Sequence, residues 1–202
     1  AEGVRLLRTH RAAGSTGVVA SAGTPIATEA DSSFVLGCGP ENAVAATKSV
    51  VEQALVYDEL FRGRNGAEPI DREALGAAFH HVLELEIPSD IVDAAIHAPV
   101  IYFAGRNDGV AEELTLKTNE ITRTRSDYLE GTYAVHGVEE VMQPDQLVII
   151  VDPFPGEEDK FRTVLRDGVG MNVVAISSRE TSFPTIQIPD LGEMNPYVQL
   201  AA

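Results

Sequence analysis

Short runs of apolar residues recur along the chain, separated by stretches with helical spacing. The runs are rich in Val and Ile and lack strict alternation of apolar and polar positions, a pattern typical of parallel strands buried on both faces. The predicted strands are residues 17–20, 34–36, 100–104, 147–151, 173–176 and 186–188. The sequence therefore predicts an α/β fold with parallel sheets flanked by helices.

Apolar residues three and four apart predict helices between these strands. The predicted helices are residues 1–11, 40–61, 71–86, a short segment leading to His97 with Ser89 or Asp90 as its cap, and 110–125. The first of these lacks the apolar centre of a signal peptide. No stretch approaches the ~20 consecutive apolar residues that a membrane helix needs.

Charge narrows the possible partners. The chain has 31 acidic and 15 basic residues and a formal charge of −16, which repels phosphate backbones and excludes nucleic-acid binding. Its lysines are only Lys48, Lys117 and Lys160. Such acid-rich, lysine-poor usage resembles proteins of salt-loving archaea, and the alternative is an ordinary acidic protein. Because the single Cys38 cannot form an internal disulfide, we expect a cytoplasmic protein.

A glycine-containing turn at 105–109 follows one predicted strand and precedes a helix. Free amides at such a helix start suit an anion such as phosphate, and Arg106 lies within the turn. The segment matches neither the Walker loop nor the dinucleotide-binding glycine pattern. A compact corner without a ligand is the alternative interpretation.

Glu113, Lys117 and Glu120 are spaced four and three apart, so a helix would place them on one face. A solvated ladder of ion pairs is the ordinary meaning of this spacing. The scarcity of lysine favours a specific role for Lys117, such as a compact donor that can lose its proton.

His136 stands sixteen residues beyond Glu120 and precedes Gly137. It is either a surface or capping residue or a catalytic imidazole. The remaining histidines show no metal-ligand spacing with one another or with Cys38; they are His10, His80, His81 and His97. We therefore expect no metal site.

Two segments together resemble a known family. Residues 39–48 read Gly-Pro-Glu-Asn-Ala-Val-Ala-Ala-Thr-Lys and resemble the Gly-Pro-Glu-x-x-Val-Ala-Ser-Thr-Lys segment of sugar isomerase (SIS) domains in glucosamine-6-phosphate synthase and related phosphosugar isomerases. Residues 113–121 read Glu-Leu-Thr-Leu-Lys-Thr-Asn-Glu-Ile and resemble the family's Glu-Gly-Ala-Leu-Lys-Leu-Lys-Glu-Ile. His136-Gly137 falls where the family has His-Gly-Pro.

This resemblance implies tandem flavodoxin-like SIS folds. Residues 1–62 would be the C-terminal half of a first domain, 63–95 connecting helices, and 96–202 a second domain without its last helix. The first domain's opening strand and its Ser/Thr-rich loops that hold the sugar phosphate would be missing, as would a lysine-bearing tail. We expect a longer full protein, the alternative being a reduced lineage.

The resemblance also implies roles for single residues. Glu120 matches the glutamate that moves a proton between adjacent sugar carbons, and Lys117 matches the lysine that works on substrate hydroxyls. His136 matches the ring-opening histidine, which in the family comes from the partner subunit, so a homodimer with a shared active site is implied. The residues expected to bind the phosphosugar substrate are Glu41, Val44, Ala46, Thr47, Lys48, Glu113 and Arg106.

Departures from the family leave the substrate open. Ala46 replaces a ligand-binding serine, Thr132-Tyr133 replaces Gly-Glu, and Val138 replaces proline. No glutaminase region is present and Cys38 lies inside the SIS pattern, so amide-nitrogen transfer from glutamine is not expected. The first hypothesis is an aldose–ketose isomerase or amino-sugar phosphate isomerase or deaminase acting without metal or organic cofactor. The alternatives are a non-catalytic sugar-phosphate-binding regulatory module and a sugar-phosphate deglycase.

Overall fold

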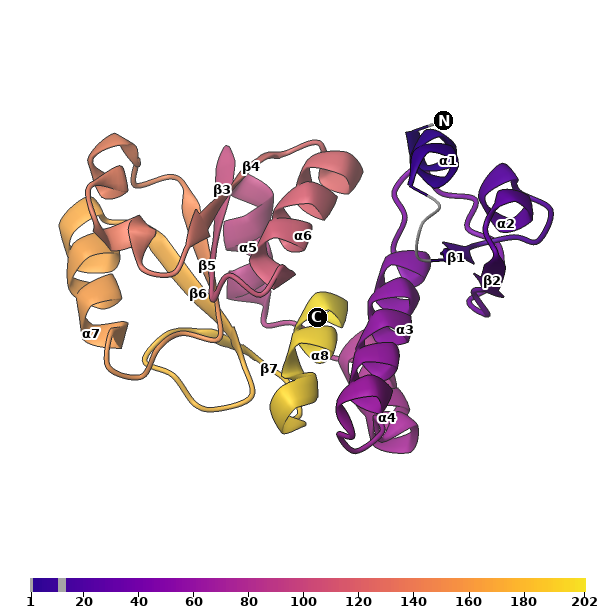
Figure 1. The fold of residues 1–202 in the computed structure, drawn as a ribbon. Helices are drawn as coiled ribbons and strands as arrows, with labels where there is room; N and C mark the ends of the chain where they lie inside the picture. Colours follow the sequence, from indigo (N-terminus) through magenta and orange to yellow (C-terminus); the bar gives the residue numbers. More distant parts are fainter. Residues whose placement is uncertain (1, 11–13) are drawn as a thin grey trace. The chain divides into compact units, whose positions relative to one another are not determined.

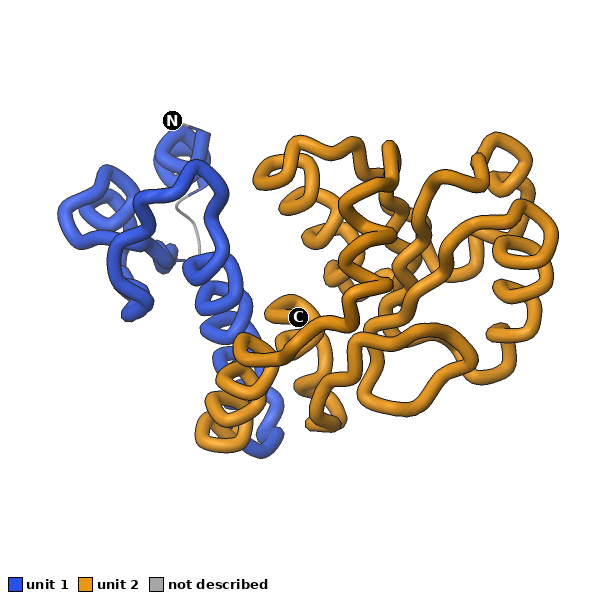
Figure 2. The backbone as a smooth tube through the Cα atoms, turned by 180° about the vertical axis from the view of Figure 1, so that it is seen from behind, with its two compact units in different colours: residues 1–69 blue, residues 70–202 orange. Residues whose placement is uncertain are grey.

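The chain forms two compact units, residues 1–69 and 70–202, which are coloured separately in Figure 2. Their elements are drawn in Figure 1. This computed structural model describes residues 2–10 and 14–202. Each unit is described by itself below. The predicted boundaries at 62/63 and 95/96 stay a prediction.

The first unit contains a two-stranded parallel sheet. Val18 pairs with Phe34 and Val19 with Val35, so both predicted strands are present. The elements of this unit are α1 (Glu2–Thr9), β1 (Thr16–Val19), α2 (Pro25–Glu29), β2 (Ser32–Val35) and α3 (Lys48–Asn65). The expectation of burial on both faces is wrong for β2, which is exposed along its whole length. A sheet of two strands offers few neighbours to cover it.

Helix α3 begins at Lys48 rather than at residue 40. Residues 40–47 form a loop, because the Glu41 carboxylate accepts hydrogen bonds from the amides of Thr47 and Lys48 at 2.8 and 2.7 Å. These amides belong to the free donors of a helix start. The helix ends at Gly66, whose left-handed φ of 68° suits glycine.

The second unit is built on a five-stranded parallel sheet in the order β4-β3-β5-β6-β7. The strands are β3 (Val100–Gly105), β4 (Arg125–Glu130), β5 (Leu147–Val151), β6 (Asn172–Ser177) and β7 (Thr185–Gln187). The apolar pattern does not predict β4, because the exposed charged residues Arg125, Asp127 and Glu130 interrupt this edge strand. Only its first residue, Arg125, falls within the helix predicted over 110–125.

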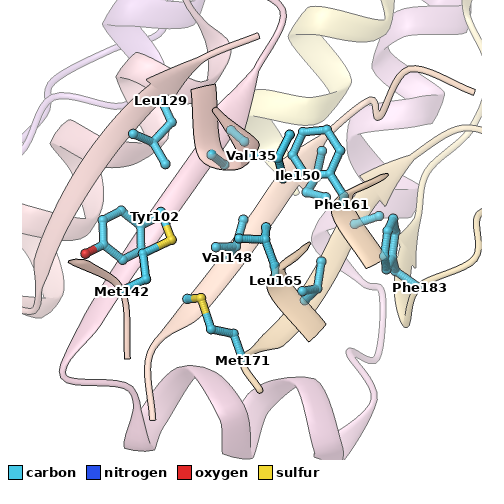
Figure 3. Packing of buried hydrophobic residues seen from close by; sticks show 14 of the residues in the cluster. Tyr102, Leu129, Val135, Met142, Val148, Ile150, Phe161, Leu165, Met171 and Phe183 are labelled. Carbon is cyan, nitrogen blue, oxygen red and sulfur yellow. The ribbon is translucent and has the colours of Figure 1, made fainter. Parts of the chain in front are cut away.

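Side chains of the central strands alternate between two buried faces. One face holds the cluster seen in Figure 3, in which Val148 and Ile150 of β5 pack against Phe161 and Leu165. This face is covered by short helical segments and one longer helix: η3 (Tyr133–Val135), η4 (Val138–Val141), α7 (Glu158–Phe161) and its continuation η5 (Arg162–Val169). Continuous burial of β3, β5 and β6 confirms the prediction made from their apolar runs.

Another layer of helices covers the opposite face, as Figure 1 shows for α5 and α6 relative to α7. On this side lie α5 (Ser89–His97), α6 (Val110–Lys117), the π-helix η2 (Thr118–Thr122) and α8 (Asn195–Ala201), which follows η6 (Gly192–Met194) and packs against α6; α4 (Arg72–Leu83) packs against α8. Asp71 caps α4 through the Ala74 amide at 3.0 Å. The predicted cap of α5 is wrong, because the helix starts at Ser89 itself, after Pro88.

Gly105 sets how closely α6 approaches the sheet. A Cβ added at this position would lie 2.5 Å from Ala111 Cβ, closer than two carbon atoms can pack. We expect Gly105→Ala to displace α6 and to lower the free energy of unfolding by about 1–3 kcal/mol. Urea unfolding would measure this loss. Gly76→Ala, a substitution with open space around it, is the control and should not be destabilising; equal stability of Gly105→Ala and the native chain would contradict the close packing.

Candidate active site

Lys117 lies between two carboxylates at the end of α6. Its Nζ is 2.6 Å from Glu120 Oε2 and 3.4 Å from Glu113 Oε1. The Lys117 side chain is only 16% exposed, whereas Glu120 remains 37% exposed. The predicted common face of these residues is confirmed in the structure. A largely covered ammonium thus stands beside a partly exposed carboxylate.

The ammonium of Lys117 keeps its proton in this arrangement. Burial acts to lower its pKa, but the hydrogen bond that Lys117 donates to Glu120 and the charge of Glu113 outweigh burial and leave the pKa raised. The expectation that Lys117 readily loses its proton is therefore wrong for this state. The residue is suited to donate hydrogen bonds as a fixed positive charge.

The backbone widens into a π-helix where Glu120 lies. Asn119 bridges this turn to the edge strand β4: its Nδ2 donates to the Thr115 and Ser126 carbonyl oxygens, and its Oδ1 accepts from the Ser126 amide, each at 3.0 Å. Arg123 then closes the segment with a left-handed φ of 59°. Local π-helical turns are frequent at functional sites.

His136 lies on the other face of the sheet, directly after η3. Ala134 and Val135 anchor it to the cluster in Figure 3, whereas α6 packs on the opposite side of β3. Its Nε2 is 3.0 Å from the Nζ of Lys160 on α7. Within one chain, the sheet thus separates His136 from Lys117 and Glu120.

Arg106 lies at the carboxyl ends of β3 and β5, where the strand order reverses direction. Its Nε donates to the carbonyl oxygen of Asp152 at 2.8 Å and contacts that residue's carboxylate at 2.7 Å, while its guanidinium stacks on Phe154. Ligands of open α/β sheets bind at such reversal points. The guanidinium already has a carboxylate partner, and Asp108 Oδ1 accepts from the Val110 amide. These contacts favour the compact-corner interpretation over a phosphate site.

The Gly-Pro-Glu segment organises the start of α3 in the first unit. Besides the two amides, Glu41 accepts hydrogen bonds from the hydroxyls of Thr47 and Ser49. Lys48 Nζ donates to the Cys38 and Pro40 carbonyl oxygens at 3.1 and 3.3 Å. These three motif residues therefore hold the loop by contacts within the unit. Val44 is fully exposed and Ala46 is half-buried in the same loop.

The hydroxyl of Ser49 and the amides of Thr47 and Lys48 lower the pKa of Glu41 to about 2. Because the pKa is lower in the folded chain, this carboxylate stabilises the loop above its unfolded pKa of about 4.3, and the contribution is lost as the pH falls toward 2. We expect Glu41 to remain ionised at about pH 3. Carbon-13 NMR of its carboxyl carbon would show this; a midpoint near pH 4 would contradict it.

Sequence reasoning missed Asn119, Lys160 and Asp152. Asn119 stands where the family segment has lysine, and this difference could have drawn attention to it. Lys160 and Asp152 contact their partners only in the folded chain. Among the described residues, no cluster of three His, Cys, Asp or Glu side chains is placed to hold a metal ion. None of the helices that the structure describes is long and apolar enough to cross a membrane.

Solved structures of other proteins share the fold of this chain. The C-terminal domain of glucosamine-fructose-6-phosphate aminotransferase from Francisella tularensis superposes with a TM-score of 0.71 at 18% identity, over 98% of this chain and 65% of that one. The chain has the SIS fold. Tagatose-6-phosphate ketose/aldose isomerase from Escherichia coli gives a TM-score of 0.68 at 19% identity, over 92% of this chain and 59% of that one. The predicted fold class is confirmed, and the tandem arrangement stays a prediction.

A sequence relative agrees with the SIS fold. Glutamine–fructose-6-phosphate aminotransferase from Streptomyces coelicolor is 28% identical over 185 residues, which cover 85% of this chain. The chain spans 29% of the length of that relative. No protein-family model matches the chain. The resemblance to the isomerase region of such aminotransferases is thereby confirmed.

Proposed function

We propose that the protein is a phosphosugar isomerase in which Glu120 transfers the proton. The observation that carries this proposal is the 2.6 Å contact between Lys117 and a partly exposed Glu120 on the SIS fold. Two of the structurally similar proteins are named as enzymes of hexose phosphates, a glucosamine-6-phosphate deaminase from Thermotoga maritima and the tagatose-6-phosphate isomerase. The site residues and their roles are part of the proposal.

In the proposed reaction, the Glu120 carboxylate removes a proton from the carbon next to the carbonyl of an open-chain sugar phosphate. The electron pair of that C–H bond forms an enediol as the carbonyl oxygen takes up a proton from water. Glu120 then returns its proton to the former carbonyl carbon, while the hydroxyl on the first carbon releases its proton to water and becomes the new carbonyl, which converts ketose to aldose. A carboxylate suits both steps because it can accept and return one proton. Lys117, which stays charged, donates hydrogen bonds to the sugar oxygens as they gain negative charge.

His136 would open the sugar ring by exchanging a proton with the ring oxygen. Since the sheet separates it from Glu120 in one chain, the proposal requires a homodimer in which His136 comes from the partner copy. The phosphosugar is the proposed substrate, and Glu113 is proposed to line the site beside Lys117; substrate binding by the Gly-Pro-Glu segment stays a prediction.

A non-catalytic sugar-phosphate-binding module is the second candidate. It is favoured by the position of Lys117 between two carboxylates, which is also the geometry of a structural ion-pair network. Deaminase and deglycase reactions would use the same glutamate and histidine with another substrate.

Solvent exchange separates the enzyme from the binding module. The protein is incubated in D₂O with fructose 6-phosphate, glucosamine 6-phosphate or tagatose 6-phosphate, and proton NMR follows deuterium at the carbons next to the carbonyl. An isomerase incorporates deuterium into at least one of them, because the enediol exchanges with solvent. Binding without exchange for every sugar would support the regulatory module and overturn the isomerase.

A further inference from the structure

Asn119 occupies an unusual place between the candidate base and the sheet. Ser126 lies on β4, which is at the end of the strand order and pairs only with β3 among the described strands. The amide and the carbonyl of Ser126 both bond to Asn119, at 3.0 Å each. The side-chain amide therefore replaces a neighbouring strand at this edge, since asparagine carries one acceptor and a donor group in one plane.

The same side chain also ties the widened turn to α6. Its second Nδ2 hydrogen bond reaches the Thr115 carbonyl one turn earlier, so three contacts fix the orientation of one amide. Ser126 is 5% exposed, and its backbone groups would lack this partner without Asn119. Glu120 follows directly in the chain, on the turn that Asn119 fixes.

We propose that Asn119 is a positioning residue, which holds the π-helical turn against β4 and thereby sets the Glu120 carboxylate at its distance from Lys117. The inference rests on the proposed function, because it gives Asn119 a part in proton transfer by Glu120. No contact between Asn119 and the substrate is required. Small displacements of a reacting group reduce rates strongly, so removing the contacts costs turnover before it costs binding.

The first experiment tests the contacts without using activity. In Asn119→Ala, amide hydrogen exchange of Ser126 should accelerate roughly tenfold, as expected for the loss of a hydrogen bond at a protected amide. Thr122→Val is the matched control: it removes the 2.7 Å bond from Thr122 Oγ1 to the Thr118 carbonyl and the 3.1 Å bond that the same oxygen accepts from the Thr124 amide, but no bond of Ser126. Unchanged Ser126 exchange in Asn119→Ala would overturn the inference.

The second experiment tests the role in catalysis by deuterium incorporation into whichever sugar phosphate the native protein turns over. Asn119→Ala should lower kcat roughly 10- to 100-fold and change KM less than threefold. Asn119→Asp keeps an acceptor for the Ser126 amide but loses both donor contacts, so it should lie between Asn119→Ala and the native protein. If Asn119→Ala fails to fold, Asn119→Asp decides in its place: a native kcat would overturn the inference.

A double-mutant cycle distinguishes positioning from general stabilisation. If Asn119 acts through Glu120, the double variant Asn119→Ala/Glu120→Gln should incorporate deuterium into the sugar phosphate no more slowly than Glu120→Gln alone. Additive losses would overturn the inference and leave the proposed function intact. Native activity of Glu120→Gln would instead refute the proposed function, whatever the exchange of Ser126 shows.

Discussion

Glu120→Gln is expected to lower the rate of deuterium incorporation about 1,000-fold, because general-base catalysis contributes on this scale. Glutamine has nearly the same shape and can still accept a hydrogen bond from Lys117, so the site should keep its form. Affinity for the sugar phosphate should change by only about threefold, since the lost step belongs to the transition state. NMR measures the exchange, and isothermal titration calorimetry measures the binding.

Glu112→Gln is the matched control for this substitution. Glu112 lies in the first turn of α6, the helix that carries Lys117; it is exposed and forms no ion pair with Lys117. Glu112→Gln removes the same charge and should keep the native rate of deuterium incorporation. If Glu120→Gln exchanges protons as fast as Glu112→Gln, another group is the base, or the exchange arises elsewhere. If the sugar binds to native protein without exchange, the regulatory module becomes the better assignment.

The sheet of the second unit was predictable because its central strands are buried on both faces. Runs such as 147–151 contain only Val, Ile and Leu, and such runs have few other places in a globular chain. Strand β4 lies at the edge and carries Arg125, Asp127 and Glu130, so it lacks the apolar run that predicts the central strands. It becomes a strand by pairing with β3, about 25 residues earlier, and a short stretch of sequence does not reveal this pairing.

The candidate site was predictable to the extent that it depends on helical spacing. Glu113, Lys117 and Glu120 meet because they lie on one helix, and Glu41 reaches α3 across a short loop. Partners from distant segments were not predictable: Lys160 reaches His136 and Asp152 reaches Arg106 only after the sheet forms. The direction of the pKa shift of Lys117 was also not predictable, because it depends on how burial and the two neighbouring carboxylates oppose one another in the folded chain.

Because His136 and Glu120 of one chain lie on opposite faces of the sheet, we expect activity to be restored when two different inactive variants form a dimer. Glu120→Gln and His136→Ala chains, each with its own affinity tag, are produced together, and dimers carrying both tags are purified. In such a hybrid, one site joins an intact Glu120 with the partner's intact His136, and the other site has lost both. Its activity should be about half that of the native dimer, whereas each variant alone should retain less than about a tenth.

A chain carrying both substitutions provides the control for this hybrid. Paired with a native chain, it gives one site with Glu120 but no imidazole and one with the imidazole but no base, so these hybrids should be nearly inactive. If each site instead used Glu120 and His136 of one chain, the results would be reversed: the first hybrid would be inactive, and the second would keep about half of the native activity. The two arrangements therefore predict opposite rankings, and the ranking does not depend on which sugar phosphate is the substrate.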